Sequence, residues 1–494
     1  MAHGHVDTVA LRDVAGNAHA ADKEGTLMTV AANETGPESA VSLDGRRFEF
    51  TAPIDAAVEP GRFVVLRPDL GGAQLGQVDG VALEGGMARG DGRILGIISD
   101  DGGALDRDRS RGFGRATVAD ADAATVELLF GAAALGLPVG AFLDSGEVPA
   151  RLLANRFNRH TFWCGQSGSG KTYALGVVLE QLLLHTGLPL VIFDPNADFV
   201  RLREPDPRSA DVDTNARLAA RDIRVLRPSS PDAQPLRVRF VDLPPRAKGA
   251  VLQLDPLDDR DEYNELVHLE AMIGSLTPDT IVPRLLERGT AAARALVARM
   301  QNLRVLDWPV WAVGAEAVTD VVEARPDATV LDLGGFAYPD EALVVALAVL
   351  DDLWAKREQR RPVLLVIDEA HNLCSPDQSS PLHIAVRERL IQIAAEGRKF
   401  GLWLLLSTQR PSRVHPSIVS QCDNLALMKM TSPVDLDELA TVFGFVPAAM
   451  LERSPRFRQG EALFAGGFVP VPTMARMGVR LTREGGGDVA VPMR

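Results

Sequence analysis

The chain has 494 residues, more than one ordinary hydrophobic core accommodates, so we expect two or three domains. A hydrophobic fraction of 46% with 24% charged residues is typical of a globular protein and excludes an intrinsically disordered chain. The formal net charge of −14 excludes a surface that is basic throughout, although it is compatible with a local basic groove for nucleic acid.

Neither a leader peptide nor a membrane anchor is expected. Residues 1–25 carry no apolar run of the kind found in secretory signals. The apolar stretch from Leu128 to Leu143 contains glycines and Pro138, is too short for a spanning helix, and is better explained by two buried strands. Three widely spaced cysteines form no metal-ligand cluster. These features indicate a reduced, cytoplasmic setting with no membrane partner.

The amino-terminal part of the chain predicts a small β domain. Residues 1–24 are polar and small, and we expect a mobile tail there. Over residues 25–150, Gly, Pro and Asp turns separate short β-prone runs at 48–51, 62–67, 94–98 and 124–130. This spacing favours a small antiparallel barrel. We find no catalytic constellation in it, which favours a structural or assembly role.

From residue 151 to 434, strands alternate with helices, which is typical of a parallel α/β sheet. The expected strands are 161–164, 190–193, 329–333, 363–367, 402–406 and 425–430. An insertion over about 201–326 has helical periodicity from Tyr263 to Ile273 and from Val282 to Leu303.

The tail of residues 435–494 predicts a short helix, 435–443, and strands at 461–464 and 468–471. In an oligomer this tail would cross to a neighbour, whereas in a monomer it would cap the sheet. The sequence leaves both arrangements open.

The stretch Gly165-Gln-Ser-Gly-Ser-Gly-Lys-Thr172 fits the pattern G-x-x-x-x-G-K-[ST], with an apolar strand before it and a periodic helix after it. In such a loop, glycines let backbone N–H groups surround phosphates, and the helix N-terminus adds a favourable dipole. We therefore expect ATP and Mg²⁺ here, with Lys171 on the β- and γ-phosphates and the Thr172 hydroxyl on Mg²⁺. The alternative is a plain Gly-rich turn. The predicted nucleotide-binding residues are Gly165, Gln166, Ser167, Gly168, Ser169, Gly170, Lys171 and Thr172.

The second motif is acidic: Asp368 and Glu369 come directly after the apolar run Val363–Ile367. A buried parallel strand carries its functional residues at its carboxyl end. Asp368 is placed to hold the Mg²⁺ shell, and Glu369 to act as the base that polarises the attacking water. The alternative is an acidic helix cap unrelated to Lys171.

Three further polar residues complete the predicted site. Gln409, at the end of the next expected strand, would sense the γ-phosphate or position water. Arg398 ends a helix that a neighbouring subunit would see, where it serves either as an arginine finger or merely as a favourable charge at a helix C-terminus. Arg159, just before the first strand, either reaches the phosphates in cis or lies on the surface.

These motifs resemble the HerA family of hexameric ATPases, relatives of the FtsK-type DNA pumps. The resemblance rests on the segments 165–172, 193–199, 368–371, 396–401, 408–413 and 420–423, and is most specific from Glu396 to Asp423. The barrel region is similar in layout to the small barrel of this family. One departure is Asn196-Ala-Asp198, where many relatives have Gly-Glu-aromatic.

The resemblance implies a RecA-like P-loop ATPase core, a homohexamer with ATP sites between subunits, and double-stranded DNA in the pore. It also implies a NurA-like nuclease partner in DNA repair or another effector in antiviral defence. Carried over by position, Lys171 and Thr172 bind phosphate and Mg²⁺, Asp368 and Glu369 serve metal and water, and Arg398 is the finger acting in trans.

Two functions follow. The first is an ATP-driven DNA translocase (a helicase-like motor) acting with a nuclease or other effector, whose pore contacts read phosphate charge and not sequence. The second is a ring scaffold that binds ATP to assemble or gate an effector while moving little DNA. The intact Glu369 and Gln409 favour hydrolysis, and the acidic overall charge favours the scaffold.

Overall fold

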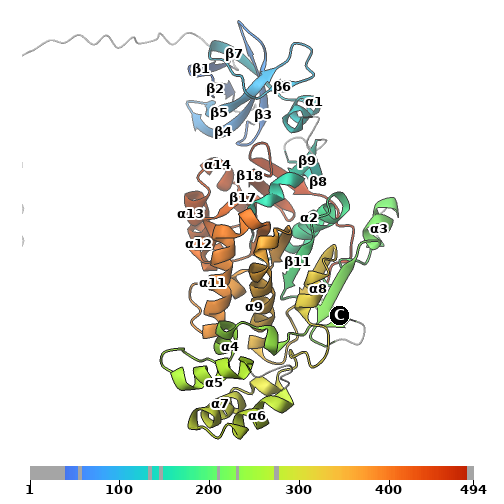
Figure 1. Ribbon diagram of the computed structural model, residues 1–494. Coiled ribbons are helices and arrows are strands. Elements are labelled where there is room, and N and C mark those ends of the chain that lie inside the picture. Colours follow the sequence, from blue (N-terminus) through green and yellow to red (C-terminus); the bar gives the residue numbers. More distant parts are fainter. Residues whose placement is uncertain are drawn as a thin grey trace, which may run out of the picture.

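The computed structural model describes residues 39–53, 58–131, 136–143, 148–207, 212–229, 233–271 and 278–486. The tail expected over residues 1–24 lies outside this part of the chain. A β-barrel lies at one end, a large sheet covered by helices forms the middle, and a helical insertion forms the other end (Figure 1). No helix in the described ranges is long and apolar enough to cross a membrane.

The expected barrel is present and closed. Six antiparallel strands follow the order β2-β1-β7-β3-β4-β5, and pairing of β5 with β2 closes the ring. Gly90 and Gly92 of β5 make room for Phe50 and Phe48 inside it, because a Cβ at either glycine would lie 2.5–2.6 Å from the facing ring. The strands are β1 Ser39–Ser42, β2 Arg47–Pro53, β3 Phe63–Pro68, β4 Gln74–Glu84, β5 Met87–Ile98 and β7 Phe113–Asp120, with the short β6 Leu105–Asp106 on β5.

Residues 121–153 differ from the strands expected there. The run at 124–130 forms α1 (Ala123–Glu127) and a 3-10 turn, because Asp122 caps the helix by accepting a hydrogen bond from the Thr125 N–H at 2.8 Å. Strands β8 (Gly136–Phe142) and β9 (Pro149–Leu153) then join the large sheet through β19 and not the barrel. The barrel sheet therefore ends at Asp120, before the expected boundary near residue 150.

The large sheet has the order β13-β12-β14-β11-β15-β16-β10-β17-β18-β19-β8-β9. It is parallel from β13 to β17, as expected, and the last four strands continue it antiparallel. All six strands expected in the core are present. They are β10 His160–Cys164, β11 Leu190–Asp194, β14 Ala328–Asp332, β15 Val363–Ile367, β16 Leu402–Thr408 and β17 Cys422–Met428; β12 Ile223–Arg227, β13 Gln234–Pro235, β18 Glu461–Gly466 and β19 Thr473–Met477 complete the sheet.

Helices bury both faces of this sheet. Alternate strand residues point to opposite faces, so Phe162 and Trp163 of β10 lie in two different cores. One core contains α9 (Pro339–Ala355) and α11 (Pro381–Glu396), and the other contains α2 (Lys171–His185). Double coverage explains why the central strands are apolar throughout.

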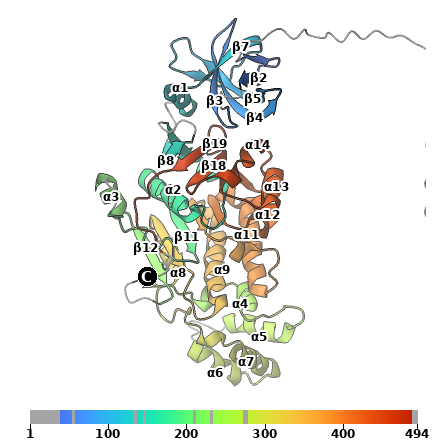
Figure 2. The same ribbon diagram turned by 180° about the vertical axis from the view of Figure 1, so that it is seen from behind.

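The described helices of the insertion between residues 245 and 302 lie at the far end from the barrel, whereas those at 212–219 and 318–323 pack on α2 and α9 beside the large sheet (Figures 1 and 2). The helix expected from Val282 to Leu303 is two helices, because Gly289 adopts φ 69° and Thr290 caps a new helix by accepting from the Ala293 N–H at 3.0 Å. The insertion helices are α4 Pro245–Val251, α5 Arg260–Ala271, α6 Pro278–Glu287, α7 Ala291–Asn302 and α8 Val318–Glu323; α3 Val212–Ala219 precedes them, and the remaining helices are α10 His371–Cys374, α12 Pro416–Val419, α13 Pro433–Val442 and α14 Ala448–Leu451.

Candidate nucleotide site

The loop Gly165–Gly170 connects the end of β10 to the first turn of α2 and has the backbone that its sequence requires. Gly168 and Gly170 have φ values of 77° and 86°, and Gly170 is the residue that precedes α2. The Gln166 N–H donates to the Lys429 carbonyl at 2.9 Å, and its side-chain oxygen accepts from the Thr431 hydroxyl at 2.8 Å. These bonds tie the loop to the end of the neighbouring β17. The loop before the N-terminus of α2 is therefore held in place, and an anion site at a helix N-terminus needs such fixed backbone N–H groups.

Lys171 is the first residue of α2, and its side chain contacts the ends of two strands, β15 and β16. Its Nζ lies 2.8 Å from Asp368 Oδ1, 2.9 Å from Ser407 Oγ and 3.3 Å from Glu369 Oε1. The side chain is only 7% exposed. Burial lowers the pKa of Lys171, but the carboxylates of Asp368 and Glu369 outweigh burial and raise the pKa above its ordinary value. Lys171 is therefore a fully charged donor held at the carboxyl ends of the strands.

Asp368 and Glu369 follow directly after β15. Ser407 of β16 donates to Asp368 Oδ1 at 2.6 Å, whereas Asp368 Oδ2 is buried without a hydrogen-bond partner among the described residues. Glu369 adopts φ 45°, which is uncommon for a residue other than glycine. His371 Nδ1 lies 3.3 Å from Glu369 Oε2 and 3.1 Å from Thr408 Oγ1. One carboxylate oxygen of Asp368 is thus left to face a further ligand.

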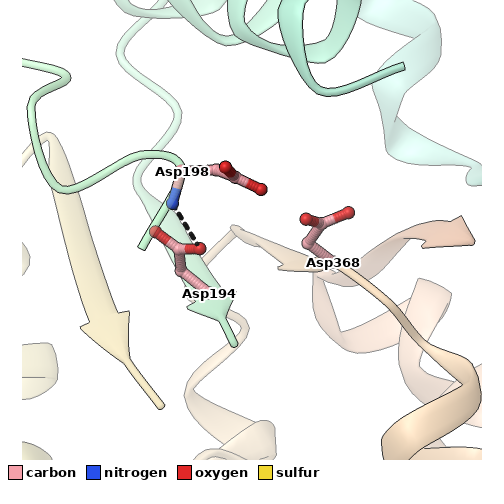
Figure 3. Close-up of side chains that lie close together, drawn as sticks. All are labelled: Asp194, Asp198 and Asp368. Atoms are coloured by element: carbon pink, nitrogen blue, oxygen red, sulfur yellow. Dashed lines mark hydrogen bonds between the residues drawn. The ribbon is translucent and has the colours of Figure 1, made fainter. Parts of the chain in front are cut away.

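Three carboxylates meet at the ends of β11 and β15 (Figure 3). Asp194, Asp198 and Asp368 each offer an oxygen, and these oxygens lie within 4.8 Å of one another. Both oxygens of Asp194 accept backbone N–H groups, of Asp198 at 2.9 Å and Phe199 at 2.8 Å, so Asp194 shapes the loop. Burial raises the pKa of Asp194 to about 7, and burial together with the Asp368 charge raises that of Asp198 to about 6.

A pocket of about 1060 Å³ opens beside these groups. Gln409, which follows β16, lines it together with Glu369. Because β16 lies between β10 and β15 in the sheet, the residues at its end emerge between the loop and the carboxylates. The pocket lining includes Gln166, Ser167, Gly168, Gly170, Lys171, Thr172, Tyr173, Asn196, Asp198, Glu369 and Gln409.

The two arginines predicted for this site lie elsewhere in the same chain. Arg398 is in the 3-10 turn Gly397–Phe400, before β16 begins, and pairs with Asp423. Arg159 directly precedes β10. Both are at the amino ends of their strands, opposite the pocket, and β10 alone spans ~16 Å. Arg159 therefore does not reach the phosphate loop of its own chain, which corrects that expectation, and Arg398 is positioned away from its own pocket.

The sequence interpretation missed part of the pocket wall. Residues of the carboxyl-terminal tail contribute to this wall, in two groups. They are Gln459, Gly460, Arg476, Met477, Gly478 and Val479, and then Glu484, Gly485 and Gly486. The missed Asp198 had a sequence signal, because it comes four residues after a buried strand that ends in Asp194. The tail had no such signal.

The donor set fits a magnesium nucleotide. Lys171 and the amino end of α2 supply the positive groups that a triphosphate requires, and the free oxygen of Asp368 and the hydroxyl of Thr172 in the pocket are hard ligands of the kind Mg²⁺ prefers. Bound Mg²⁺ supplies charge neutralisation of the phosphates. The residues present are therefore sufficient for the cofactors that the loop motif predicts.

Parts of the chain match known proteins. Residues 137–313 match the family described as "Helicase HerA, central domain". A probable helicase, MJ1565, of Methanocaldococcus jannaschii is 23% identical over 374 residues, which cover 72% of this chain and 69% of that protein. The DNA double-strand break repair helicase HerA of Sulfurisphaera tokodaii is 35% identical over 117 residues, which cover 24% of this chain and 23% of that protein.

Two solved structures match the chain at lower identity. The bacterial conjugative coupling protein TrwB is 14% identical with a TM-score of 0.49, and the alignment covers 74% of this chain and 93% of that one. VirB4 of Thermoanaerobacter pseudethanolicus is 17% identical with a TM-score of 0.45, over 70% of this chain and 96% of that one.

Proposed function

We propose that this chain, which belongs to the HerA family of P-loop ATPases, hydrolyses ATP to move double-stranded DNA through a ring of identical subunits. The observation that carries the proposal is the convergence of Lys171, Glu369 and Gln409 on one pocket at the carboxyl ends of β10, β15 and β16, with Asp368 Oδ1 2.8 Å from the Lys171 Nζ. Binding of a magnesium nucleotide accounts for Asp368 beside Lys171, whereas the second carboxylate, Glu369, is the base that hydrolysis requires. Family relatives are described as DNA repair helicases, which supports DNA as the substrate.

In this proposal each residue has a separate task. Lys171 and the loop amides hold the triphosphate, and Asp368 with Thr172 holds the metal. Glu369 takes a proton from the attacking water, and Gln409 orients that water beside the γ-phosphate. Lys171 contacts both carboxylates, so bound phosphates would compete for it and release Glu369 toward the water.

The position of Arg398 supports an assembled ring. It lies at the opposite end of the sheet from its own pocket, and a neighbouring subunit packed against that end would receive its guanidinium. An arginine placed beside the γ-phosphate neutralises charge in the transition state. We therefore propose a homohexamer with ATP sites between subunits, acting with a nuclease or another effector.

The acidic overall charge favours a second candidate, the ring scaffold that binds ATP while moving little DNA. The two candidates differ in how hydrolysis responds to DNA. A motor whose pore grips phosphates gains turnover from linear duplex DNA, and this gain fades as salt rises because contacts with phosphates release counterions. The test is the ATPase rate of the purified full chain with and without duplex, at low and moderate salt. Hydrolysis indifferent to DNA at both salts contradicts the motor and favours the scaffold.

A further inference from the structure

The segment Gly478–Gly486, here called the strap, lies along α2, the helix that begins at the phosphate loop. The Arg480 N–H donates to the Tyr173 hydroxyl at 2.8 Å. The Leu481 N–H and the Thr482 N–H donate to the two carboxylate oxygens of Glu180 at 2.8 and 2.9 Å. Tyr173 and Glu180 are seven residues apart and so share one face of the helix. In Figure 2 the carboxyl-terminal trace runs down beside α2.

A buried ion pair fixes the centre of the strap. Arg480 Nε lies 3.7 Å from Glu180 Oε1, and both side chains are at most 1% exposed. The Arg480 guanidinium also lies over the Phe199 ring, at 5.6 Å from its centroid. Gly176 leaves the space for this side chain, because a Cβ there would lie 2.6 Å from Arg480 Nε. A buried pair adds little net stability, but it fixes one arrangement of the groups that it joins.

The far end of the strap is held by the loop after β11. The Arg483 N–H donates to the Glu204 carbonyl at 2.8 Å, and the Gly485 N–H donates to the Asp198 carbonyl at 3.1 Å. Only glycine fits at position 485, since a Cβ would lie 2.0 Å from the Ala197 carbonyl oxygen. The strap therefore connects α2 to the loop that carries Asp198.

Both ends of the strap reach the nucleotide pocket. Gly478 and Val479 line it at one end, and Glu484 to Gly486 line it at the other. Val479 is 70% exposed, although its neighbour Arg480 is buried. Met477, just before the strap, adds a second apolar side chain to the same wall.

We infer that the strap is the nucleoside-binding wall of this pocket, with Val479 as its contact to the base; this inference rests on the proposed ATPase function. Lys171 and Asp368 would fix the triphosphate, so the base and ribose are the parts of ATP left to meet Gly478 and Val479, which line the pocket together with Tyr173. An exposed valine on a rigidly anchored backbone supplies the apolar surface that a base requires. Since α2 begins directly after the phosphate loop and also forms hydrogen bonds with the strap, one helix positions both the phosphate-binding and the nucleoside-binding parts of the site.

The test compares two ligands of the full-length protein by calorimetry: a non-hydrolysable ATP analogue and inorganic tripolyphosphate, both with Mg²⁺. The variant Val479→Ser weakens binding of the analogue about fivefold, as loss of one apolar contact predicts, and leaves tripolyphosphate unchanged. Gly485→Ala displaces the strap from Ala197 and weakens the analogue about tenfold, and it weakens tripolyphosphate less, through the Asp198 carbonyl that the Gly485 N–H holds.

Two matched controls keep their wild-type affinity for both ligands. Val212→Ser removes an equally exposed valine (76%) on α3, outside the pocket lining. Gly187→Ala adds a methyl group where nothing lies within 4 Å. Wild-type affinity for the analogue in both strap variants overturns the inference, and so does an equal loss for both ligands. Failure of the proposed motor is a different result, since DNA would then leave turnover unchanged while the strap variants still separated the two ligands.

Discussion

Lys171 Nζ lies 2.8 Å from Asp368 Oδ1, although the two residues are 197 positions apart in the chain. The pair joins the start of α2 to the end of β15 across β16, which lies between β10 and β15. The lysine proposed to bind phosphate and the carboxylate proposed to bind Mg²⁺ are thus in direct contact. In the proposed mechanism the triphosphate competes with Asp368 for Lys171, which couples nucleotide binding to the sheet.

Replacement of the lysine tests this coupling. Lys171→Ala should abolish nucleotide binding, because the triphosphate loses its central cation. It should also lower the free energy of unfolding by about 3–5 kcal/mol, since Asp368 is left buried and uncompensated. Calorimetry and thermal denaturation measure the two effects. Lys399→Ala, at an exposed lysine near the other end of β16, is the control that should change neither. Unchanged affinity in Lys171→Ala would contradict the assignment.

Glu369 is predicted to act in chemistry and not in binding. Glu369→Gln should keep the affinity for ATP close to wild type while lowering kcat by ~100-fold or more, because the amide cannot accept the proton of the attacking water. Glu358→Gln, at an exposed glutamate, should leave both quantities unchanged. Turnover equal to wild type in Glu369→Gln would remove the base role from this residue.

Arg398 allows a test that separates a structural role from a role in the neighbouring site. Arg398→Ala should retain nucleotide affinity and lose turnover. Asp423→Asn removes the ion-pair partner of Arg398 but keeps the guanidinium, so it should retain most of the turnover. If Asp423→Asn is as inactive as Arg398→Ala, the arginine acts by holding the fold. Activity recovered by mixing Arg398→Ala with Glu369→Gln subunits would support a shared interface.

His160 gives the protein an acid-sensitive contact. Its Nδ1 accepts the Leu404 N–H at 2.9 Å, and its Nε2 lies 3.0 Å from the Ala394 carbonyl. Burial, with the nearby Arg398 charge, lowers the pKa of His160 to about 4. In the unfolded chain His160 takes up a proton at higher pH than in the folded protein. The contribution of neutral His160 to the free energy of unfolding is therefore fully present above about pH 6.5 and is lost as the pH drops toward 4.

The measurement is the melting temperature between pH 7.5 and 4.5 for the wild type and His160→Gln. Across this pH window, protonation of His160 should lower the free energy of unfolding of the wild type by up to ~3 kcal/mol, seen as a lower melting temperature. The variant should melt at a lower temperature than the wild type at pH 7.5, but its melting temperature should depend less on acid. Parallel pH curves for the two proteins would show that His160 does not titrate in this way.

The sequence predicts that Lys171, Asp368, Glu369 and Gln409 lie close together, for a physical reason. Buried parallel strands are continuous apolar runs, and the polar residues that follow them must gather at one edge of the sheet. Lys171, Asp368, Glu369 and Gln409 are all of this kind. The prediction that Arg159 reaches the phosphates of its own chain is wrong, because Arg159 precedes β10 and the phosphate loop follows β10, so the two lie at opposite ends of this strand.

Other features depend on contacts that no local pattern reveals. The antiparallel extension joins β8 to β19, segments separated by most of the chain. Glu180 and Arg480 are ordinary charged residues in sequence, and only the fold shows that they are buried together. The sequence alone does not decide whether the tail of residues 435–494 crosses to a neighbour or caps the sheet of its own chain. Its described part, through Gly486, packs on its own chain.

If ATP hydrolysis moves DNA through the protein, the moving duplex displaces a triplex-forming third strand. Linear duplex DNA carries the third strand, and its release is followed with the full chain, ATP and Mg²⁺. A DNA motor gives release that requires ATP, falls with salt and is absent for Glu369→Gln. Vigorous ATP hydrolysis by the wild type in the same reaction, with the third strand left in place, would contradict translocation.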